Sequence, residues 1–446
     1  MQEGLPDEAA VVALFRRNTE TKSTDTSVLF AFFAQWFTDS FLRTSHKEGE
    51  FGQNTSNHEI DLCQIYGLSE EKTTMLRARE GGRLRSQLID GAEYPEFLFQ
   101  PRQPGGTLVF KDEFAGLHDY EFLTGAILEE AADQHKDTMF AVGLEHGNST
   151  IGNTVMNVLF MREHNRVAGL IRDANPGWDN ERLFQTARNV MIVMMLNLVV
   201  QEYIVHIAPF DFPLQNVPFM ADGAKWNKSN WIAIEFNLLY RWHSLVPDSI
   251  GDGADRLDPD QFRNNNPLVI SRGIEGLISE FSAEKAGKIG LGNTPPFLVD
   301  RRDPERPSIE ERTVRLMRQA RLRSYNDYRK EFNLDRMKSF EQLTANTTLQ
   351  KRLKEMYGSI DRLEWYVGIF AEDYGKDSMM GGLLTTMVAY DAFTQALTNP
   401  LLARRINNEN TFSAAGLKVI DTTKTLKQIV VRNSDPTKTV RVSFKA

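Results

Sequence analysis

Cysteine is almost missing from this 446-residue sequence, in which Cys63 is the only one. A single cysteine excludes an intrachain disulfide and any CxxC metal or redox motif, so thiol usage gives no reason to expect an oxidising compartment. The sequence also contains no GxGxxG, Walker, GxSxG or HExxH pattern. We therefore do not expect the common nucleotide-binding, serine-hydrolase or zinc-protease functions.

Positive charge is outnumbered by negative charge, and long apolar runs are scarce. The 52 Lys and Arg residues stand against 60 Asp and Glu, which gives a formal net charge of -8. No basic stripe interleaved with aromatic residues occurs, so nucleic acid is not an expected partner. The N-terminus lacks the pattern of a signal peptide, and the most apolar run, residues 190–200, is interrupted by Asn197 and is too short to span a bilayer. We expect no transmembrane segment and a cytoplasmic protein, with peripheral membrane contact as an alternative.

The sequence does contain abundant helical periodicity, broken by polar loops rich in glycine and proline. We find no internal repeat, low-complexity segment or linker, and therefore predict one large, mainly α domain over residues 1–446. Residues 1–24 are a candidate flexible N-terminal segment. Helices are expected at residues 28–44, 121–134, 154–172, 181–207, 231–247, 272–286, 310–331, 349–356, 360–370 and 379–397. A short strand is expected at residues 83–90 and a terminal β hairpin at residues 425–444.

The stretch WIAIEFNLLYRWHSLVPDS, residues 231–249, stands out among these elements. Its apolar residues recur at helical spacing, and Pro247 stops the predicted helix. Tyr240 and His243 are three residues apart, so a continuous helix would place them on the same face. Buried polar groups need partners. The pair is therefore either a hydrogen-bonded core pair, or a metal-ligating histidine beside a phenol that can be oxidised.

Two other polar features interrupt apolar helices. Gln35 and Asp39 share one face of the strongly aromatic helix predicted at residues 28–44. A carboxylate there is unexpected, because aspartate is rarely buried without a partner; it meets a basic residue, lies at the helix exit or has a functional role. The second feature is REHNR, residues 162–166, a polar cluster that is typical of a structural network tying helices together.

Several segments together resemble the animal haem peroxidase superfamily, and most closely its cyclooxygenase and fatty-acid dioxygenase branch. In chain order they are FAFFAQWFTDSFLRT, IDLCQIYG, QLIDGAEYP, AVGLEHG, MREHNRV, LFQTAR, AIEFNLLYRWHSLVPDS, YNDYRKEF and YGSIDRLEWYVG. They cover the chain from about Ala13 onward. The resemblance implies a helical haem-peroxidase-like fold with haem b as cofactor. It also implies an enzyme that makes lipid hydroperoxides from polyunsaturated fatty acids and O2.

The resemblance assigns roles to individual residues. His243 matches the proximal histidine that ligates haem iron, and Tyr240 matches the tyrosine whose radical abstracts a hydrogen from the fatty acid. Tyr366 matches a tyrosine on the proximal side that tunes the histidine. Three further positions match residues that line the substrate channel: Tyr203, Trp242 and Ala392.

The distal side departs from the family pattern. Gln35 matches the distal glutamine, but Asp39 stands where the family has a distal histidine that moves a proton between the peroxide oxygens. A carboxylate can do this if its pKa is raised by an apolar site. His146 falls where some members carry a distal arginine. We hypothesise that Asp39, His146 or both together transfer the proton; the alternative for His146 is an ordinary loop residue.

Other departures affect the cofactor, the substrate and the activity. The positions that esterify haem in mammalian peroxidases correspond here to Thr38, Ser149 and Thr150, so the resemblance implies non-covalent haem. The arginine that pairs with the substrate carboxylate in cyclooxygenases has no counterpart, and Arg404 or Arg405 is a candidate for that role. Two alternatives to the dioxygenase remain: a haem peroxidase that uses small reductants, and a haem-binding relative with impaired catalysis.

Overall fold

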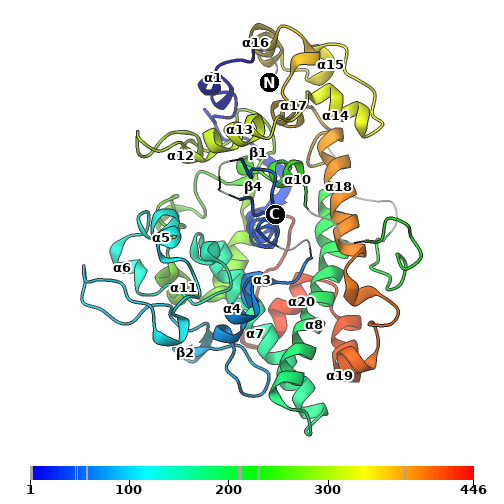
Figure 1. The fold of residues 1–446 in the computed structure, drawn as a ribbon. Coiled ribbons are helices and arrows are strands. Elements are labelled where there is room, and N and C mark those ends of the chain that lie inside the picture. Colours follow the sequence, from blue (N-terminus) through cyan, green and yellow to red (C-terminus); the bar gives the residue numbers. More distant parts are fainter. Residues whose placement is uncertain are drawn as a thin grey trace.

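The computed structural model describes residues 4–45, 47, 49–56, 59–208, 213–228, 232–375 and 378–446. Helices form nearly all the regular secondary structure in this part of the chain (Figure 1). The strands form two separate antiparallel pairs. The predicted mainly α fold with short β elements is therefore confirmed.

The helices are numbered here in chain order. In the first half they are α1 (Glu8–Val12), α2 (Val28–Thr38), α3 (Cys63–Tyr66), α4 (Glu70–Leu76), α5 (Tyr120–Leu123), α6 (Asp133–Lys136), α7 (Ile151–Ala174), α8 (Asn180–Leu198) and α9 (Ile204–Ile207). In the second half they are α10 (Ile234–Leu239), α11 (Asn266–Ala283), α12 (Pro296–Val299), α13 (Ile309–Gln319), α14 (Tyr325–Glu331), α15 (Phe340–Leu343), α16 (Thr347–Tyr357), α17 (Trp365–Ala371), α18 (Gly382–Leu397), α19 (Glu409–Thr422) and α20 (Leu426–Arg432). The strand pairs are β1 (Lys22–Ser27) with β4 (Lys285–Gly287), and β2 (Gln87–Ile89) with β3 (Ala92–Tyr94).

Helix α2, drawn in blue near the centre of Figure 1, passes through the core. Its N-cap is Ser27, whose hydroxyl accepts a hydrogen bond from the backbone N–H of Phe30. The helix ends at Thr38 and not at residue 44 as predicted. The hydroxyls of Thr38 and Ser40 donate back to carbonyls of the preceding turn, at 2.8 Å each, and such bonds compete with continuation of a helix.

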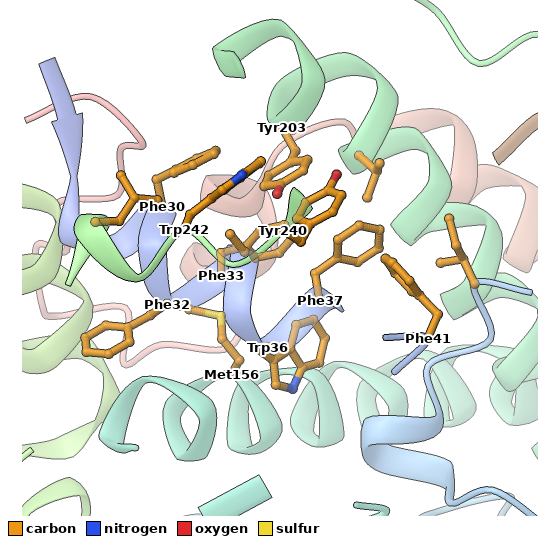
Figure 2. Packing of buried hydrophobic residues seen from close by; sticks show 14 of the residues in the cluster. Phe30, Phe32, Phe33, Trp36, Phe37, Phe41, Met156, Tyr203, Tyr240 and Trp242 are labelled. Atoms are coloured by element: carbon orange, nitrogen blue, oxygen red, sulfur yellow. The ribbon is translucent and has the colours of Figure 1, made fainter. Parts of the chain in front are cut away.

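Aromatic side chains of α2 point to two different sides in Figure 2. Phe32 and Trp36 face α7, where Met156 lies, whereas Phe30, Phe33 and Phe37 face Tyr203, Tyr240 and Trp242. All of these side chains are buried. Helix α2 therefore forms a shared wall between the long helix α7 and the part of the core that contains Tyr240.

The helices α2 and α7 approach closely where Gly152 lies in the first turn of α7. A Cβ atom at that position would lie 2.1 Å from Cγ of Phe32. The contact therefore requires a glycine, because no side chain fits between Phe32 and the α7 backbone.

The REHNR cluster on α7 is a structural network, as predicted. His164 is hydrogen-bonded to the Tyr66 hydroxyl at 2.8 Å and to the carbonyl of Gly82 at 2.9 Å. Arg162 donates to the carbonyl of Glu93 at 2.6 Å, and Asn165 accepts a bond from the N–H of Leu84 at 2.8 Å. These bonds fix α7 to α3 and to the β2–β3 region.

The predicted continuous helix over residues 231–247 is wrong. Trp231 lies outside the described residues, α10 ends at Leu239, and a separate 3-10 turn, η5 (His243–Leu245), follows. Between them the N–H of Trp242 donates to the carbonyl of Tyr240 at 2.8 Å, and Trp242 has φ -80° and ψ 47°, which is not helical. Tyr240 and His243 therefore do not share one helix face.

Other predicted boundaries also change. The helix expected at 310–331 is two helices, α13 and α14, separated at Arg321, whose φ is 55°. The helix expected at 121–134 is divided into α5, a π-helical turn over Thr124–Leu128 and α6. The terminal hairpin expected at 425–444 is wrong, because this region contains α20, which starts with a reciprocal capping box between Thr425 and Gln428.

The long predicted helix at 181–207 is confirmed as α8, a π-helical turn η4 (Val199–Tyr203) and α9 in direct succession. From the sequence alone, the apolar run at residues 190–200 is expected to be too short to span a bilayer. The whole 28-residue helix, Asn180–Ile207, is long and apolar enough to cross a membrane by length and composition alone. However, 78% of its most apolar window is buried inside the protein. The buried core helix of a globular protein can have the same length and apolar composition.

Residues 4–24, named above as a candidate flexible segment, make extensive contacts. Val11 and Phe15 are buried, and Arg16 forms an ion pair with Asp300 at 2.8 Å. The Arg17 side chain is buried and donates to the carbonyls of Ser244 and Val246, at 3.1 and 2.9 Å. The segment therefore supports the turn that contains His243.

Gly152→Ala should destabilise the protein by about 1–3 kcal/mol, because the new methyl group forces Phe32 or the α7 backbone to shift. Gly169→Ala, on the same helix, is the matched control. A Cβ atom at Gly169 has no neighbour within 4 Å, so alanine there should stabilise the helix by about 0.5–1 kcal/mol. Urea unfolding of both variants measures the difference. Equal effects of the two substitutions would contradict this account of the α2–α7 contact.

Candidate active site

The turn that carries His243 is held in place from two directions. Arg17 from the N-terminal segment donates to the carbonyls on its C-terminal side. On another side, Gly287 of β4 approaches so closely that a Cβ atom there would lie 2.0 Å from the carbonyl oxygen of Ser244. The backbone at His243 is therefore positioned by segments that are far away in the sequence.

The His243 side chain is oriented by a buried carboxylate. Its Nδ1 lies 2.7 Å from Oε2 of Glu310, and the Glu310 side chain is completely buried. The other oxygen of the same carboxylate, Oε1, accepts a hydrogen bond of 3.0 Å from the Tyr366 hydroxyl. With both carboxylate oxygens placed as acceptors, Nδ1–H of His243 is the donor to Oε2, and Nε2 is the ring nitrogen left to bind a metal.

Glu310 reaches this position from the first turn of α13. The helix starts at Ser308, which forms a capping box with Glu311. The positive end of the helix dipole favours a carboxylate in this turn. Tyr366 comes from α17 and is packed between Phe15 and Phe370, each with a ring-centroid distance of 5.1 Å. The three polar groups thus come from three separate elements.

Tyr240, the C-cap of α10, lines an apolar cavity next to α2. Its ring stacks on Trp242 at 4.6 Å and meets the edge of Phe236 at 5.0 Å. The cavity is lined by Phe37, Phe41, Ile60, Val199, Tyr203, Phe236, Tyr240, Ala392 and Gln395. Burial raises the pKa of Tyr240, although the neighbouring Tyr203 hydroxyl lowers it. The phenol therefore keeps its proton at neutral pH.

The predicted channel residues are partly brought together. Tyr203, in the π-helical turn η4, and Ala392, on α18, both line the cavity with Tyr240. Trp242 is not among the lining residues and lies instead between Tyr240 and Phe30, whose ring is 6.4 Å away (Figure 2). Trp242 thus supports the tyrosine ring from behind.

The candidate carboxylate-binding arginines lie away from this cavity. The Arg404 guanidinium is 4.8 Å above the Phe219 ring, and its backbone N–H donates to Asp222 at 3.1 Å. Phe219 and Asp222 belong to a second pocket, beyond the C-terminal end of α18. Arg405 is exposed. Neither arginine contacts the cavity that contains Tyr240.

Gln35 and Asp39 lie on α2 and at its C-cap, and both are partly buried. Thr150 donates to Oε1 of Gln35 at 3.4 Å, and Asn153 donates to Oδ2 of Asp39 at 3.0 Å. Asp39 is therefore at the helix exit, as one of the sequence interpretations held. Its hydrogen-bond partner is an amide.

Burial raises the pKa of Asp39 to about 7, against the opposing effects of the Asn153 hydrogen bond and of the Arg43 and Arg241 charges. Burial raises the pKa of Tyr366 well above its ordinary value, the Glu310 charge adds to that rise, and the same Arg241 guanidinium opposes it. Arg241 thus lies within electrostatic reach of both the Asp39 side and the Glu310–Tyr366 side. Asp39 has a pKa suited to exchanging a proton near neutral pH.

His146 lies in a 3-10 turn, η3 (Glu145–Asn148), and is connected to Asp39 through Asn153. The Asn153 amide group donates to the His146 carbonyl at 3.3 Å as well as to Asp39. The His146 ring itself meets the edge of Phe122, with centroids 5.7 Å apart. The structure therefore joins the backbone at His146 to Asp39, while its ring packs against another element.

Comparison with known proteins assigns this arrangement to a class. The family model described as animal haem peroxidase matches residues 40–444. The chain belongs to the animal haem peroxidase family, whose members are haem-dependent oxidoreductases. The predicted resemblance is confirmed.

Individual relatives narrow the comparison. The chain is 33% identical over 426 residues to prostaglandin G/H synthase 1 of Rattus norvegicus, which covers 94% of this chain and 65% of that protein. It is 31% identical over 432 residues to prostaglandin G/H synthase 2 of Gallus gallus, covering 96% and 66%. The chain thus spans less than two thirds of the length of these curated relatives. The predicted similarity to the cyclooxygenase branch is confirmed.

Solved structures share the fold. Peroxidase A from Dictyostelium discoideum superposes with a TM-score of 0.77 at 20% identity, over 100% of this chain and 92% of that one. The Oryza sativa fatty acid alpha-dioxygenase gives a TM-score of 0.74 at 17% identity, over 96% and 78%.

Haem is the cofactor of this family, and the residues present fit it. A histidine whose Nδ1–H is donated to a carboxylate presents Nε2 to a metal, which is the usual arrangement of a histidine ligand. His243 has this donor set. At the positions that resemble the esterifying ones, Thr38, Ser149 and Thr150 offer hydroxyl groups and no carboxylate or thioether. We therefore expect these positions to form no covalent link to haem.

Three residues of this site were missed by sequence reasoning: Glu310, Asn153 and Arg241. Glu310 had no distinctive signal, because it and Glu311 stand side by side in the same helical turn. One is completely buried, whereas the other pairs with Arg301 at 2.8 Å. The adjacency of Arg241 to Tyr240 was visible in the sequence, but its electrostatic partners were not. Asn153 was visible only as one of several polar residues before the REHNR cluster.

Asp39→Asn should change the pH dependence of stability in the protein without added haem. The folded-state pKa of about 7 lies above the ordinary value of 3.8, so the folded state favours the protonated acid. The free energy of unfolding of the wild type should therefore fall, relative to the variant, as pH rises from about 4 to 7, and then level off.

Urea unfolding at pH 4.5, 6 and 8 measures this effect, and the variant should gain roughly 1–3 kcal/mol by pH 8. Asp173→Asn, which removes an exposed carboxylate on α7, is the control for the loss of one negative charge. An identical pH trend in the two variants would count against the altered pKa of Asp39.

Proposed function

We propose that this protein is a haem-dependent fatty-acid dioxygenase that forms lipid hydroperoxides from polyunsaturated fatty acids and O2 through a radical on Tyr240. The observation that carries the proposal is the combination of Tyr240 on an apolar cavity with His243, three residues later, oriented as a metal ligand. Relatives named prostaglandin G/H synthase support it. Residues 1–446 form one catalytic domain in this proposal.

The cavity supplies the binding surface for the acyl chain. Aromatic and aliphatic side chains dominate its lining, and such a surface holds hydrocarbon and keeps water away from a radical. Ala392 has a small side chain, which leaves space along the cavity and influences where oxygen adds. The cavity is narrow, so occupancy requires side chains such as Phe37 and Phe41 to move.

Bound haem would supply the oxidising power that a hydroperoxide delivers. Tyr240 then loses one electron and its phenolic proton to become a phenoxyl radical. The phenoxyl takes a hydrogen atom from the activated CH2 of the fatty acid, and the resulting carbon radical adds O2. The peroxyl radical takes a hydrogen atom back from Tyr240, which yields the hydroperoxide and restores the tyrosyl radical.

We assign the proton transfer that peroxide cleavage requires to Asp39, at the C-terminal end of α2. The carboxylate accepts the proton of the incoming hydroperoxide and returns it to the leaving oxygen. Asn153 holds the carboxylate through a hydrogen bond of 3.0 Å, and Gln35 lies one turn earlier on the same helix. His146 acts with Asp39 as a second proton carrier in this proposal.

A second candidate is a peroxidase that uses small reductants, with Tyr240 not involved. The raised pKa of Asp39 beside Gln35 supports it, because proton transfer during peroxide cleavage does not itself require a radical on Tyr240. A measurement of oxygen uptake with linoleic acid and haem separates this peroxidase from the dioxygenase.

Tyr240→Phe should abolish oxygen uptake with linoleic acid and haem, because phenylalanine has no hydroxyl to form the radical. An oxygen electrode measures the uptake. Tyr390→Phe is the control, since Tyr390 is on α18 but 65% exposed, and uptake should be unchanged.

The other outcomes are equally informative. No uptake by the wild type, with a hydroperoxide-driven change in the haem spectrum, would favour the peroxidase. The absence of a Soret band after haem addition would reject both activities and leave a relative with impaired catalysis.

Asp39→Ala and His146→Ala should each slow hydroperoxide reduction, Asp39→Ala by about 10²–10⁴-fold if it is the main proton carrier. In the wild type the rate should rise with pH through about 7, where Asp39 becomes the ionised acceptor. Stopped-flow reduction of a hydroperoxide by the haem-loaded variants measures both. Wild-type rates in both variants would refute the assignment.

A further inference from the structure

We propose that Glu310 and Tyr366 form a hydrogen-bonded relay that sets how strongly His243 donates electron density to iron. Glu310 is the positioning residue, and the hydrogen bond from Tyr366 weakens the effect of the Glu310 carboxylate on His243. The inference rests on the proposed haem ligation by His243. It assigns a role to Glu310, and it states in which direction Tyr366 changes the donor strength of His243.

The geometry separates the two functions of the carboxylate. Oε2 accepts from His243 at 2.7 Å and Oε1 accepts from Tyr366 at 3.0 Å. The shorter bond pulls the Nδ1 proton toward Glu310, which gives the ring partial imidazolate character and makes Nε2 a stronger donor. The longer bond draws charge toward the other oxygen.

Burial makes both bonds strong. The side chain of Glu310 has no exposure and Tyr366 is fully buried, so water does not compete for either carboxylate oxygen. Glu310 sits in the first turn of α13, where the helix dipole favours negative charge. The carboxylate of Glu310 is therefore held by the helix N-terminus, the phenol and the imidazole together.

Removing the two partners should have opposite consequences. A neutral amide at position 310 can still accept a bond from Nδ1–H, but it lacks the charge that strengthens the ligand. Loss of the Tyr366 hydroxyl instead concentrates the carboxylate charge on the bond to His243. A stronger ligand stabilises ferric over ferrous iron. The midpoint potential should thus rise in one variant and fall in the other.

The test is spectroelectrochemistry of the haem-loaded full-length protein. We expect Glu310→Gln to shift the ferric/ferrous midpoint to a more positive potential and to weaken haem binding by about 10–100-fold. We expect Tyr366→Phe to shift the midpoint to a more negative potential. In the double variant the Tyr366→Phe shift should disappear, because its effect is transmitted through the carboxylate.

Glu311→Gln is the matched control. It removes the same charge from the adjacent position, and glutamine can keep the capping box with Ser308. Its midpoint should equal that of the wild type. Midpoints that move in the same direction in Glu310→Gln and Tyr366→Phe, an unchanged midpoint in either, or an equal shift in Glu311→Gln would overturn the relay.

A second measurement covers a variant that loads too little haem. In the full-length protein before haem addition, 15N NMR should show His243 as the Nδ1–H tautomer in the wild type and as a mixture of tautomers in Glu310→Ala. A mixture already present in the wild type would overturn the relay. Failure of the wild type to bind haem at all would instead refute the proposed function, which the Soret titration reports separately.

Discussion

The hydrogen bond of 2.7 Å between His243 and Glu310 joins residues that are 67 positions apart, and much of the surrounding structure depends on it. A buried carboxylate is stable only when its oxygens have partners. Glu310 lies at the start of α13, where the helix N–H groups favour a carboxylate. The hydroxyl of Tyr366 donates a hydrogen bond to its second oxygen. Arg17 and Gly287 in turn hold the backbone that presents His243.

Helix α2 couples this site to the rest of the core. Its aromatic residues divide between the side of α7 and the side of Tyr240, as Figure 2 shows. Its polar residues, Gln35 and Asp39, lie one turn apart near the helix end, where Asn153 of α7 reaches Asp39. One helix can therefore bound an apolar cavity and also carry the polar groups to which we assign proton transfer, because a period of 3.6 residues sends successive side chains in different directions.

Sequence reasoning succeeded where the signal was local and long. The helices predicted at 154–172 and 181–207 are present, because their helical periodicity extends over many turns. The prediction failed at 231–247 and at 425–444, where the outcome depends on a short bend at Trp242 and on a single capping box at Thr425. Such features involve one or two residues, and periodicity averages over them.

By itself the sequence determined the family, the mainly α class and the residue types at the site, including Tyr240, His243 and the unusual Asp39. These follow from segments that keep their order and local character along the chain. Only the tertiary structure decided that Glu310, and not the adjacent Glu311, meets His243, and that an amide from α7 meets Asp39. Contacts between distant segments arise from packing, and two neighbouring glutamates have the same local preferences until one of them is buried.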